Sequence, residues 1–283
     1  MDIRGDTGAR GAKWSYEETL AAFGLYMLLN RRQRNNKSAP EIARLSEGLH
    51  RTSGAVYMKL MNLRTYDPNE HAQGIAGLRH GSQYEPRIWE EYLAQNDSLL
   101  ATALHYYAEF LKGTQPILEP RTQTLSIVED VTSTFIAEFT SHGTQSQPLG
   151  SERETITLTR VNQNYFRNSL VANYNDSCCL TGISLEPLLV ASHIKPWKDS
   201  TGFEKTNAAN GLLLNAFHDK AFDRGYMTVD DDYRVRISRQ VPHTDVNEKW
   251  LYQFEGQHIV MPKVNPPSHE FLEYHHKHVF LTS

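Results

Sequence analysis

The sequence predicts an α+β fold in two domains joined by a linker. Residues 1–112 carry apolar side chains at helical spacing and should form an all-helical domain. Residues 113–156 are rich in Thr, Ser, Gln, Pro and Gly, a composition typical of an interdomain linker. Residues 157–283 mix short β-branched apolar segments with helical ones, which predicts a second, mixed domain. A chain of 283 residues is long enough for two such domains.

The helices of the first domain begin at recognisable capping residues. Ser15 and Glu18 form a capping-box pattern before an apolar run, and Ser38 and Glu41 repeat this pattern. Apolar residues then follow at helical spacing on two short helices, namely Ile42, Leu45 and Leu49 on one and Val56, Leu60 and Leu63 on the next. Glycines and prolines in residues 67–86 predict a loop before the last helix of the domain.

These two short helices, with a tight turn between them, have the outline of a helix-turn-helix. From Arg31 to Arg64 the segment holds eight basic residues against two acidic ones, although the whole chain has a net charge of −4. A basic segment on an acidic protein favours contact with phosphate, whereas the alternative is the solvated surface of an ordinary αα-hairpin. Under the first interpretation, the candidates to face DNA are Arg51, Ser53, Tyr57, Lys59 and Arg64.

Composition narrows the class of protein. The chain is 39% hydrophobic and 22% charged, which is typical of a globular protein. It has no run of about 18 apolar residues, so we expect no membrane-spanning helix. The N-terminus lacks the apolar segment of a secretory signal, which predicts a cytoplasmic location.

The two cysteines, Cys178 and Cys179, are adjacent. Neighbouring cysteines rarely close a disulfide because the resulting ring is strained. The paired spacings of a structural zinc site are absent from the sequence. We therefore expect both to be buried, small apolar residues.

The second domain shows a helix, a strand, a hairpin and a final helix. Residues 164–174 have helical apolar spacing, and residues 188–194 are as apolar as a buried strand. Residues 225–238 alternate around three aspartates, which predicts a hairpin. The last helix, near residues 269–280, contains His275, His276 and His278. It has no evident carboxylate or cysteine partner for a metal ion, so we expect a surface helix.

Three residues in this domain suggest chemistry. His193 ends the predicted strand, Asn210 follows seventeen residues later, and His218 follows after eight more. Phosphodiester hydrolysis needs an activated water and charge stabilisation on the phosphate and the leaving oxygen. One imidazole can act as the base, and a second imidazole with a carboxylate can hold a divalent ion. A lone histidine beside an apolar run is more often a satisfied core residue, but the ordered set of three favours a site.

Four short motifs carry a resemblance to a known family. They are Cys178 or Cys179 to Gly182, Ser192 to Trp197, Asn210 to Leu214, and His218 to Gly225. In this order they resemble the HNH (ββα-metal) nuclease superfamily. The subgroup they resemble is the one found in bacterial restriction-endonuclease-like proteins. The resemblance covers about residues 157–280 and implies a ββα-metal fold for this domain.

The resemblance implies a role for each residue of the site. His193 would be the general base, His218 a metal ligand and Asn210 an orienting residue. One divalent ion would serve each site: Mg²⁺ is expected, with Mn²⁺, Ni²⁺ or Zn²⁺ as alternatives. Many family members have Asp immediately before the first His, where this chain has Ser192. Asp223 is then the candidate second ligand and Asp219 the alternative, unless Asp223 only fixes the end of its helix.

The implied substrate is double-stranded DNA. Further candidates for phosphate contact are Lys195, Lys198, Lys220 and Arg224, with Arg160, Gln163 and Arg167 on the preceding helix. Trp197 and Phe222 are expected in the core rather than stacked on bases.

The resemblance leaves three functions open. A restriction or defence endonuclease would read a specific or modified site with its helical domain, and a homodimer would make the two strand cuts. The alternatives are an inactive HNH-fold DNA-binding protein, with Ser192 as the symptom, and a nuclease without sequence preference or acting on RNA.

Overall fold

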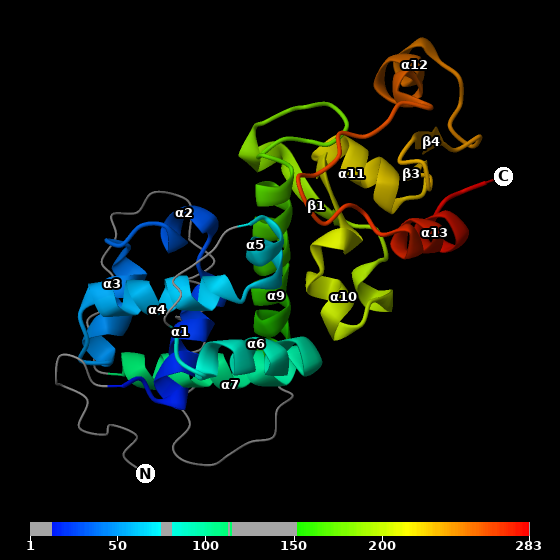
Figure 1. Ribbon diagram of the computed structural model, residues 1–283. Coiled ribbons are helices and arrows are strands. Elements are labelled where there is room, and N and C mark those ends of the chain that lie inside the picture. Colours follow the sequence, from blue (N-terminus) through cyan, green and yellow to red (C-terminus); the bar gives the residue numbers. More distant parts are fainter. Residues whose placement is uncertain (1–12, 75–80, 113, 115–151, 283) are drawn as a thin grey trace. The chain divides into compact units, whose positions relative to one another are not determined.

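The computed structural model describes residues 13–74, 81–112, 114 and 152–282, and it divides the chain into two compact units (Figure 1). One unit is Met1–Tyr165 and the other is Phe166–Ser283. The predicted arrangement of a helical N-terminal domain before a mixed C-terminal one agrees with this. Most of the predicted linker, residues 113–156, lies outside the described residues.

Helices form the described part of the first unit. They are α1 (Tyr16–Leu28), α2 (Arg31–Arg34), α3 (Pro40–Gly48), α4 (Ser53–Thr65), α5 (Pro68–Ala72), α6 (Tyr84–Ala94), α7 (Asn96–Leu111) and the first part of α9 (Glu152–Asn173). The capping box of Ser15 and Glu18 starts α1 as predicted. Helix α1 is buried along most of its length and packs on α7, α4 and α6, so it forms the centre of the apolar core.

Two expectations for the helices need correction. Residues 67–74, expected as a loop, contain α5, because the Asp67 side chain accepts hydrogen bonds from the backbone amides of Asn69 and Glu70 and starts the helix. Helix α9 begins at Glu152, twelve residues before the predicted start.

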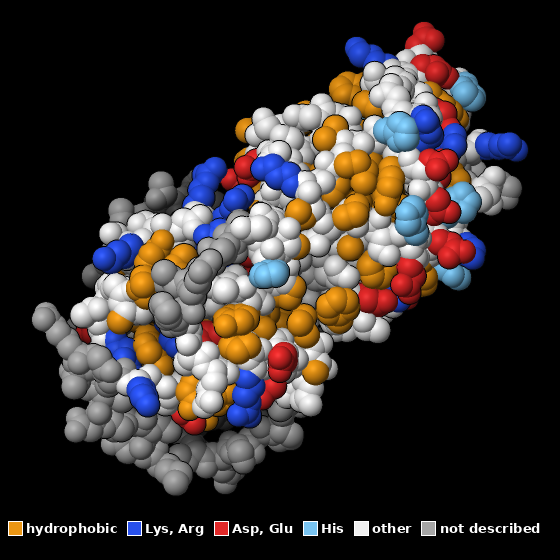
Figure 2. Space-filling model, viewed as in Figure 1, with side chains coloured by type: hydrophobic (Ala, Val, Ile, Leu, Met, Phe, Trp, Pro, Cys, Tyr) orange, Lys and Arg blue, Asp and Glu red, His pale blue; other side chains and the backbone are white. Residues whose placement is uncertain are grey.

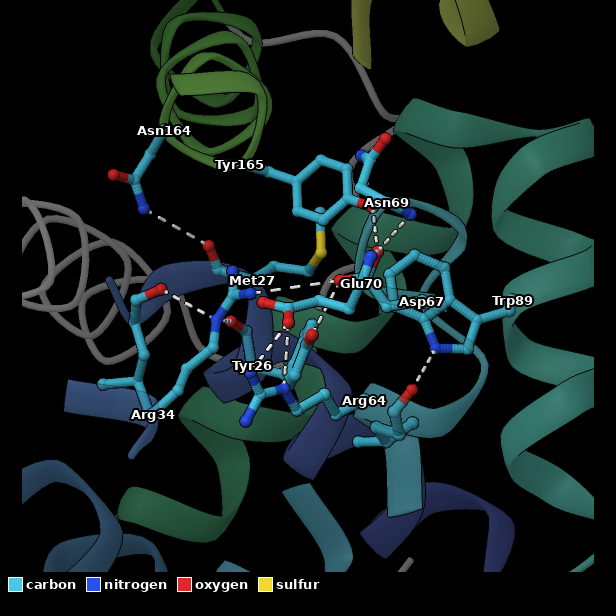
Figure 3. Close-up of polar contacts among 12 residues, drawn as sticks. Tyr26, Met27, Arg34, Arg64, Asp67, Asn69, Glu70, Trp89, Asn164 and Tyr165 are labelled. Carbon is cyan, nitrogen blue, oxygen red and sulfur yellow. Dashed lines mark hydrogen bonds and ion pairs between the residues drawn. The ribbon is translucent and has the colours of Figure 1, made fainter. Parts of the chain in front are cut away.

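A buried polar network holds the end of α4, α5 and the N-terminal part of α9 within the first unit (Figure 3). The Asp67 carboxylate, 1% exposed, accepts hydrogen bonds from the hydroxyls of Tyr26 and Tyr165, both at 2.6 Å. Arg34 stacks on the Tyr26 ring and donates its Nε to the carbonyls of Tyr26 and Leu29. Closed off from solvent, this cluster serves the architecture of the unit.

The second unit is built on a ββα arrangement. Strand β1 (Leu189–His193) pairs antiparallel with β2 (Gly211–Asn215), and α11 (Ala216–Asp223) packs against both. A 3-10 turn (Glu186–Leu188) precedes β1. Between the strands lie two further 3-10 turns (Trp197–Asp199 and Ala208–Asn210) and α10 (Gly202–Thr206).

A hairpin and three further helical segments complete the second unit. The predicted hairpin is confirmed as β3 (Met227–Val229) with β4 (Val235–Ile237). It is followed by α12 (Asp245–Trp250), a 3-10 turn (Tyr252–Phe254) and α13 (His269–His278). Both cysteines are buried and free, as expected. In the described part of the chain, no helix is both long and apolar enough to cross a membrane.

Candidate active site

Strand pairing brings the first two predicted residues together. His193 at the end of β1 pairs with Gly211, the neighbour of Asn210. A Cβ on Gly211 would lie 2.5 Å from the Phe166 ring and 2.6 Å from a Leu170 methyl, so only glycine lets α9 lie this close to the strand. The resulting packing places the Phe166 ring against His193.

The half-buried His193 ring is held on two sides. It stacks on Phe166 with ring centroids 3.8 Å apart, and its Nε2 lies 2.9 Å from the Lys205 carbonyl oxygen. A carbonyl can only accept a hydrogen bond, so Nε2 carries the proton and Nδ1 has the lone pair. Burial lowers the pKa of His193 to about 4, so the ring is neutral at pH 7. Such an imidazole can accept a proton through Nδ1.

Asn210 is fully buried and organises the loop after His193. Its Oδ1 accepts the backbone amide of Lys195 at 2.8 Å, and its Nδ2 donates to the carbonyl of Glu204 at 3.0 Å and to the Ser200 hydroxyl at 3.3 Å. Its backbone carbonyl accepts from Ile194. These bonds fit the orienting role that the resemblance implied.

His218 has no ring nitrogen left for a metal ion. Its Nδ1 lies 2.8 Å from the Asn215 side-chain Nδ2, and its Nε2 lies 2.9 Å from the Trp250 carbonyl oxygen. The amide donates to Nδ1 and Nε2 donates to the carbonyl, so both positions are used. The side chain is 2% exposed and burial lowers its pKa. This geometry argues against the expected ligand role. His218 instead links α11 to the end of α12 through the hydrogen bonds of a neutral imidazole.

Helix α11 also carries two carboxylates, and their pKa values are raised rather than lowered. Asp219 and Asp223 are four residues apart and so lie on one face of the helix. Burial raises the pKa of Asp219, and the charge of Asp223 raises it further. Burial also raises the pKa of Asp223, while Lys220 and Arg224 oppose that shift. Within the described residues, neither carboxylate forms a salt bridge.

Ser192, on strand β1, lies near one of these carboxylates, that of Asp219. Its hydroxyl is near enough to lower the pKa of Asp219, yet the buried Oγ has no hydrogen-bond partner of good geometry among the described residues. The residue is 2% exposed and precedes His193 directly. A buried, incompletely bonded hydroxyl near a carboxylate is the kind of arrangement that a bound ion would complete.

The oxygen donors suit a hard cation. Mg²⁺ and Mn²⁺ prefer oxygen ligands, and Mg²⁺ is often held by one or two carboxylates, with water and substrate phosphates completing its shell. Among the described residues, no group of three or more His, Cys, Asp and Glu side chains surrounds a common point. The two carboxylates therefore fit an ion that shares its coordination with a phosphate, and they fit a closed zinc site poorly.

Three of the five predicted DNA-binding residues of the first unit form ion pairs within the protein. Lys59 is 3% exposed and forms a 2.5 Å ion pair with Glu85. Arg51 pairs with Glu18 at 2.9 Å, and Arg64 pairs with Glu70 at 2.8 Å (Figure 3). The acidic partners lie outside the segment from Arg31 to Arg64, which is why its charge count suggested a free basic face.

The remaining candidates of α4 are also partly covered. The Ser53 hydroxyl lies 3.1 Å from that of Ser46, and Tyr57 packs against the core. Arg32 and Lys37 are exposed in the same segment. On the face drawn in Figure 2, basic side chains stand in small groups with acidic ones between several of them. Helices α3 and α4 thus form the predicted pair, but the face expected to contact DNA is largely neutralised.

Of the DNA-binding candidates in the second unit, some are bonded within the protein and others are exposed. The Arg167 guanidinium donates to the carbonyls of Leu189 and Glu186 and braces the start of β1. Lys195 forms a 2.9 Å ion pair with Glu204. Lys198 is exposed, as are Lys220 and Arg224 on α11. The last three side chains are thus exposed, whereas the Arg167 guanidinium is bonded to backbone carbonyls.

The aromatic side chains of the second unit differ from one another in burial. Phe222 is fully buried as expected, whereas Trp197 is half-buried and lies in a T-shaped arrangement with His193, with ring centroids 5.3 Å apart. His275, expected on a surface helix, is 1% exposed and stacks on Phe222, while His276 and His278 are exposed. The helical spacing of Phe271, Leu272 and His275 was the signal for its burial.

Comparison with known proteins adds one finding. Residues 178–230 match the family described as HNH endonuclease. The match includes β1, β2, α11 and β3 and ends before α12 and α13. No curated protein matches the chain.

Proposed function

Because residues 178–230 place this chain in the HNH endonuclease superfamily, we propose that it is a metal-dependent DNA endonuclease of the restriction or defence kind. The observation that carries the proposal concerns the three histidines of the second unit whose pKa burial lowers. His218 and His275 use both ring nitrogens in hydrogen bonds, whereas Nδ1 of His193 has no hydrogen bond to a described residue. His193 is therefore the one of the three that can take a proton from water.

The other residues of the candidate site each have a separate role in the proposed reaction. The Lys205 carbonyl fixes the Nε2–H tautomer, so that Nδ1 is the basic atom. Asn210 bonds the Glu204 carbonyl in α10, the helix that carries Lys205, and Ser192 lies near the carboxylate of Asp219. Asp219 and Asp223 would hold one divalent ion, Mg²⁺ or Mn²⁺. When bound, such an ion supplies charge stabilisation at the scissile phosphate and the leaving oxygen.

Plasmid cleavage tests the activity. Purified protein should cut DNA with Mg²⁺, Mn²⁺ or Ni²⁺, and His193→Ala should lower the rate by about 10²–10⁴-fold while DNA binding is retained. His276→Ala, a change at an exposed histidine, is the matched control and should cut normally. The absence of cleavage of methylated and unmethylated DNA with every metal would favour the alternative, an inactive DNA-binding protein, which the serine at position 192 motivates.

Mn²⁺ titration tests the carboxylate site separately. Asp219→Asn and Asp223→Asn should each weaken Mn²⁺ binding at least about tenfold, because each removes a charged ligand. Asp232→Asn, in the exposed hairpin turn, is the matched control. Loss of Mn²⁺ binding in a folded His218→Phe variant, with the two asparagine variants unaffected, would restore His218 as the ligand.

Fragment patterns test the restriction role. Discrete fragments from genomic DNA would support reading of a specific or modified site by the first unit. A smear would support the second candidate, a non-specific nuclease, which the paired states of Arg51, Lys59 and Arg64 favour. We further propose that two copies act together, because one HNH site makes one strand cut. Light scattering of the protein with and without DNA measures this.

A further inference from the structure

Helix α13, which lies outside the residues that match the family, contacts the C-terminal turn of α11 through His275. The Nε2 of His275 donates to the Phe222 carbonyl at 3.2 Å, and Nδ1 accepts from the Thr228 hydroxyl at 2.8 Å. The imidazole also stacks on the Phe222 ring, with centroids 3.7 Å apart and planes at 15°. Both ring nitrogens of His275 and one face of its ring therefore contact residues of α11 and β3.

The chain beyond α13 contacts the same turn twice more. Gly225 has φ +73°, and a Cβ on it would lie 2.1 Å from the Val279 carbonyl oxygen, so only glycine permits the approach. The Gly225 carbonyl then accepts the backbone amide of Leu281 at 3.0 Å. Residues 275–281 thus hold α11 on both sides of Asp223, at Phe222 and at Gly225.

We propose that His275 is a positioning residue, which with residues 275–281 fixes the last turn of α11 and so the direction of the Asp223 carboxylate toward a bound cation. The proposal rests on the carboxylate site of the proposed function. His275 acts through the Phe222 backbone and touches no reacting atom. Groups bonded directly to metal ligands typically change metal affinity by about 10–100-fold when removed, and His275 acts one residue away from the ligand, so we expect an effect at the lower end of that range.

Mn²⁺ affinity, measured by calorimetry on the full chain, is the first test. His275→Phe keeps the aromatic stack on Phe222 and loses both hydrogen bonds, so Mn²⁺ should bind about tenfold more weakly. His275→Gln keeps a donor for the Phe222 carbonyl and should recover most of that loss. His276→Phe, at the neighbouring exposed position, is the control. A folded His275→Phe variant that binds Mn²⁺ as tightly as the wild type overturns the proposal.

Hydrogen exchange gives a second test that needs no metal. The amides of Arg224, Gly225 and Tyr226 donate within the last turn of α11. In His275→Phe they should exchange at least about tenfold faster than in the wild type, with no change in α9. Unchanged exchange in this turn overturns the proposal. If His275→Phe does not fold, Thr228→Val, which removes only the hydroxyl that bonds Nδ1, should show the same two effects at smaller size, and their absence is equally decisive.

The two proposals fail in different ways. Loss of the carboxylate site would appear in the wild type and in Asp223→Asn, as absent Mn²⁺ binding or as binding that does not depend on Asp223. Loss of the His275 proposal would appear as Mn²⁺ binding that depends on Asp223 but not on His275.

Discussion

The two units bury polar side chains by different means. The first unit buries charges as ion pairs, as in Lys59 with Glu85 and Arg51 with Glu18. The second buries neutral imidazoles, and His193, His218 and His275 each place Nε2 on a backbone carbonyl. An ion pair neutralises the charge of both partners, whereas a neutral imidazole bonded at one nitrogen still has another nitrogen. Of these three imidazoles, only that of His193 has a ring nitrogen, Nδ1, without a hydrogen bond to a described residue.

The largest expected effect breaks a buried pair in the first unit. Lys59→Met leaves Glu85 buried and unpaired, and should lower the free energy of unfolding by about 3–5 kcal/mol. Lys37→Met, at an exposed position, should change it by less than about 0.5 kcal/mol. Urea unfolding measures both. A Lys59→Met variant as stable as the wild type but weak in DNA binding would contradict the structural role of Lys59.

Acid should act mainly on the second unit. Burial lowers the pKa of His193 and of His275 from 6.5 to about 4, so the unfolded chain binds these protons first. Their contribution to stability is complete above pH 6.5 and is lost as pH falls toward 4, by about 3 kcal/mol for each residue. His275→Gln should lose correspondingly less stability between pH 6.5 and 4. Parallel stability curves for His275→Gln and the wild type would disprove this.

A smaller effect on stability tests whether His218 is a structural residue rather than a metal ligand. His218→Phe removes the side-chain partner of the Trp250 carbonyl and one of the partners of the Asn215 amide, and should destabilise the protein by about 1–3 kcal/mol. Mn²⁺ affinity of the folded variant should stay within about twofold of the wild type. Thermal unfolding and Mn²⁺ titration of the same sample give both values.

The smallest expected effect is a gain in stability. Asp219→Asn removes a half-buried charge that lies near Asp223, so it should raise the free energy of unfolding by up to about 1 kcal/mol. Residues selected for function are often unfavourable for folding. Asp232→Asn should be neutral in the same chemical denaturation assay, and a destabilised Asp219→Asn would show that Asp219 is structural.

The local pattern of the sequence predicted much of the fold and of the region around His193. Apolar spacing located β1, the hairpin and α13, and the ordered motifs predicted the ββα core. The failures share a cause, which is partners distant in sequence. Nothing near His218 indicates that the Trp250 carbonyl, thirty-two residues later, occupies its Nε2. Glu70 and Glu85, outside the basic segment, likewise neutralise Arg64 and Lys59.

The adjacent cysteines offer a chemical reporter of how often the ββα core opens. The Cys178 Sγ accepts the backbone amide of Asn215, the residue that caps α11, and both thiols are 1% exposed. A thiol reagent can therefore react only when the junction of β2 and α11 separates. Its rate of labelling under native conditions measures the free energy of that opening. The chain thus carries its own probe, without any engineered label, at the helix that bears Asp219 and Asp223.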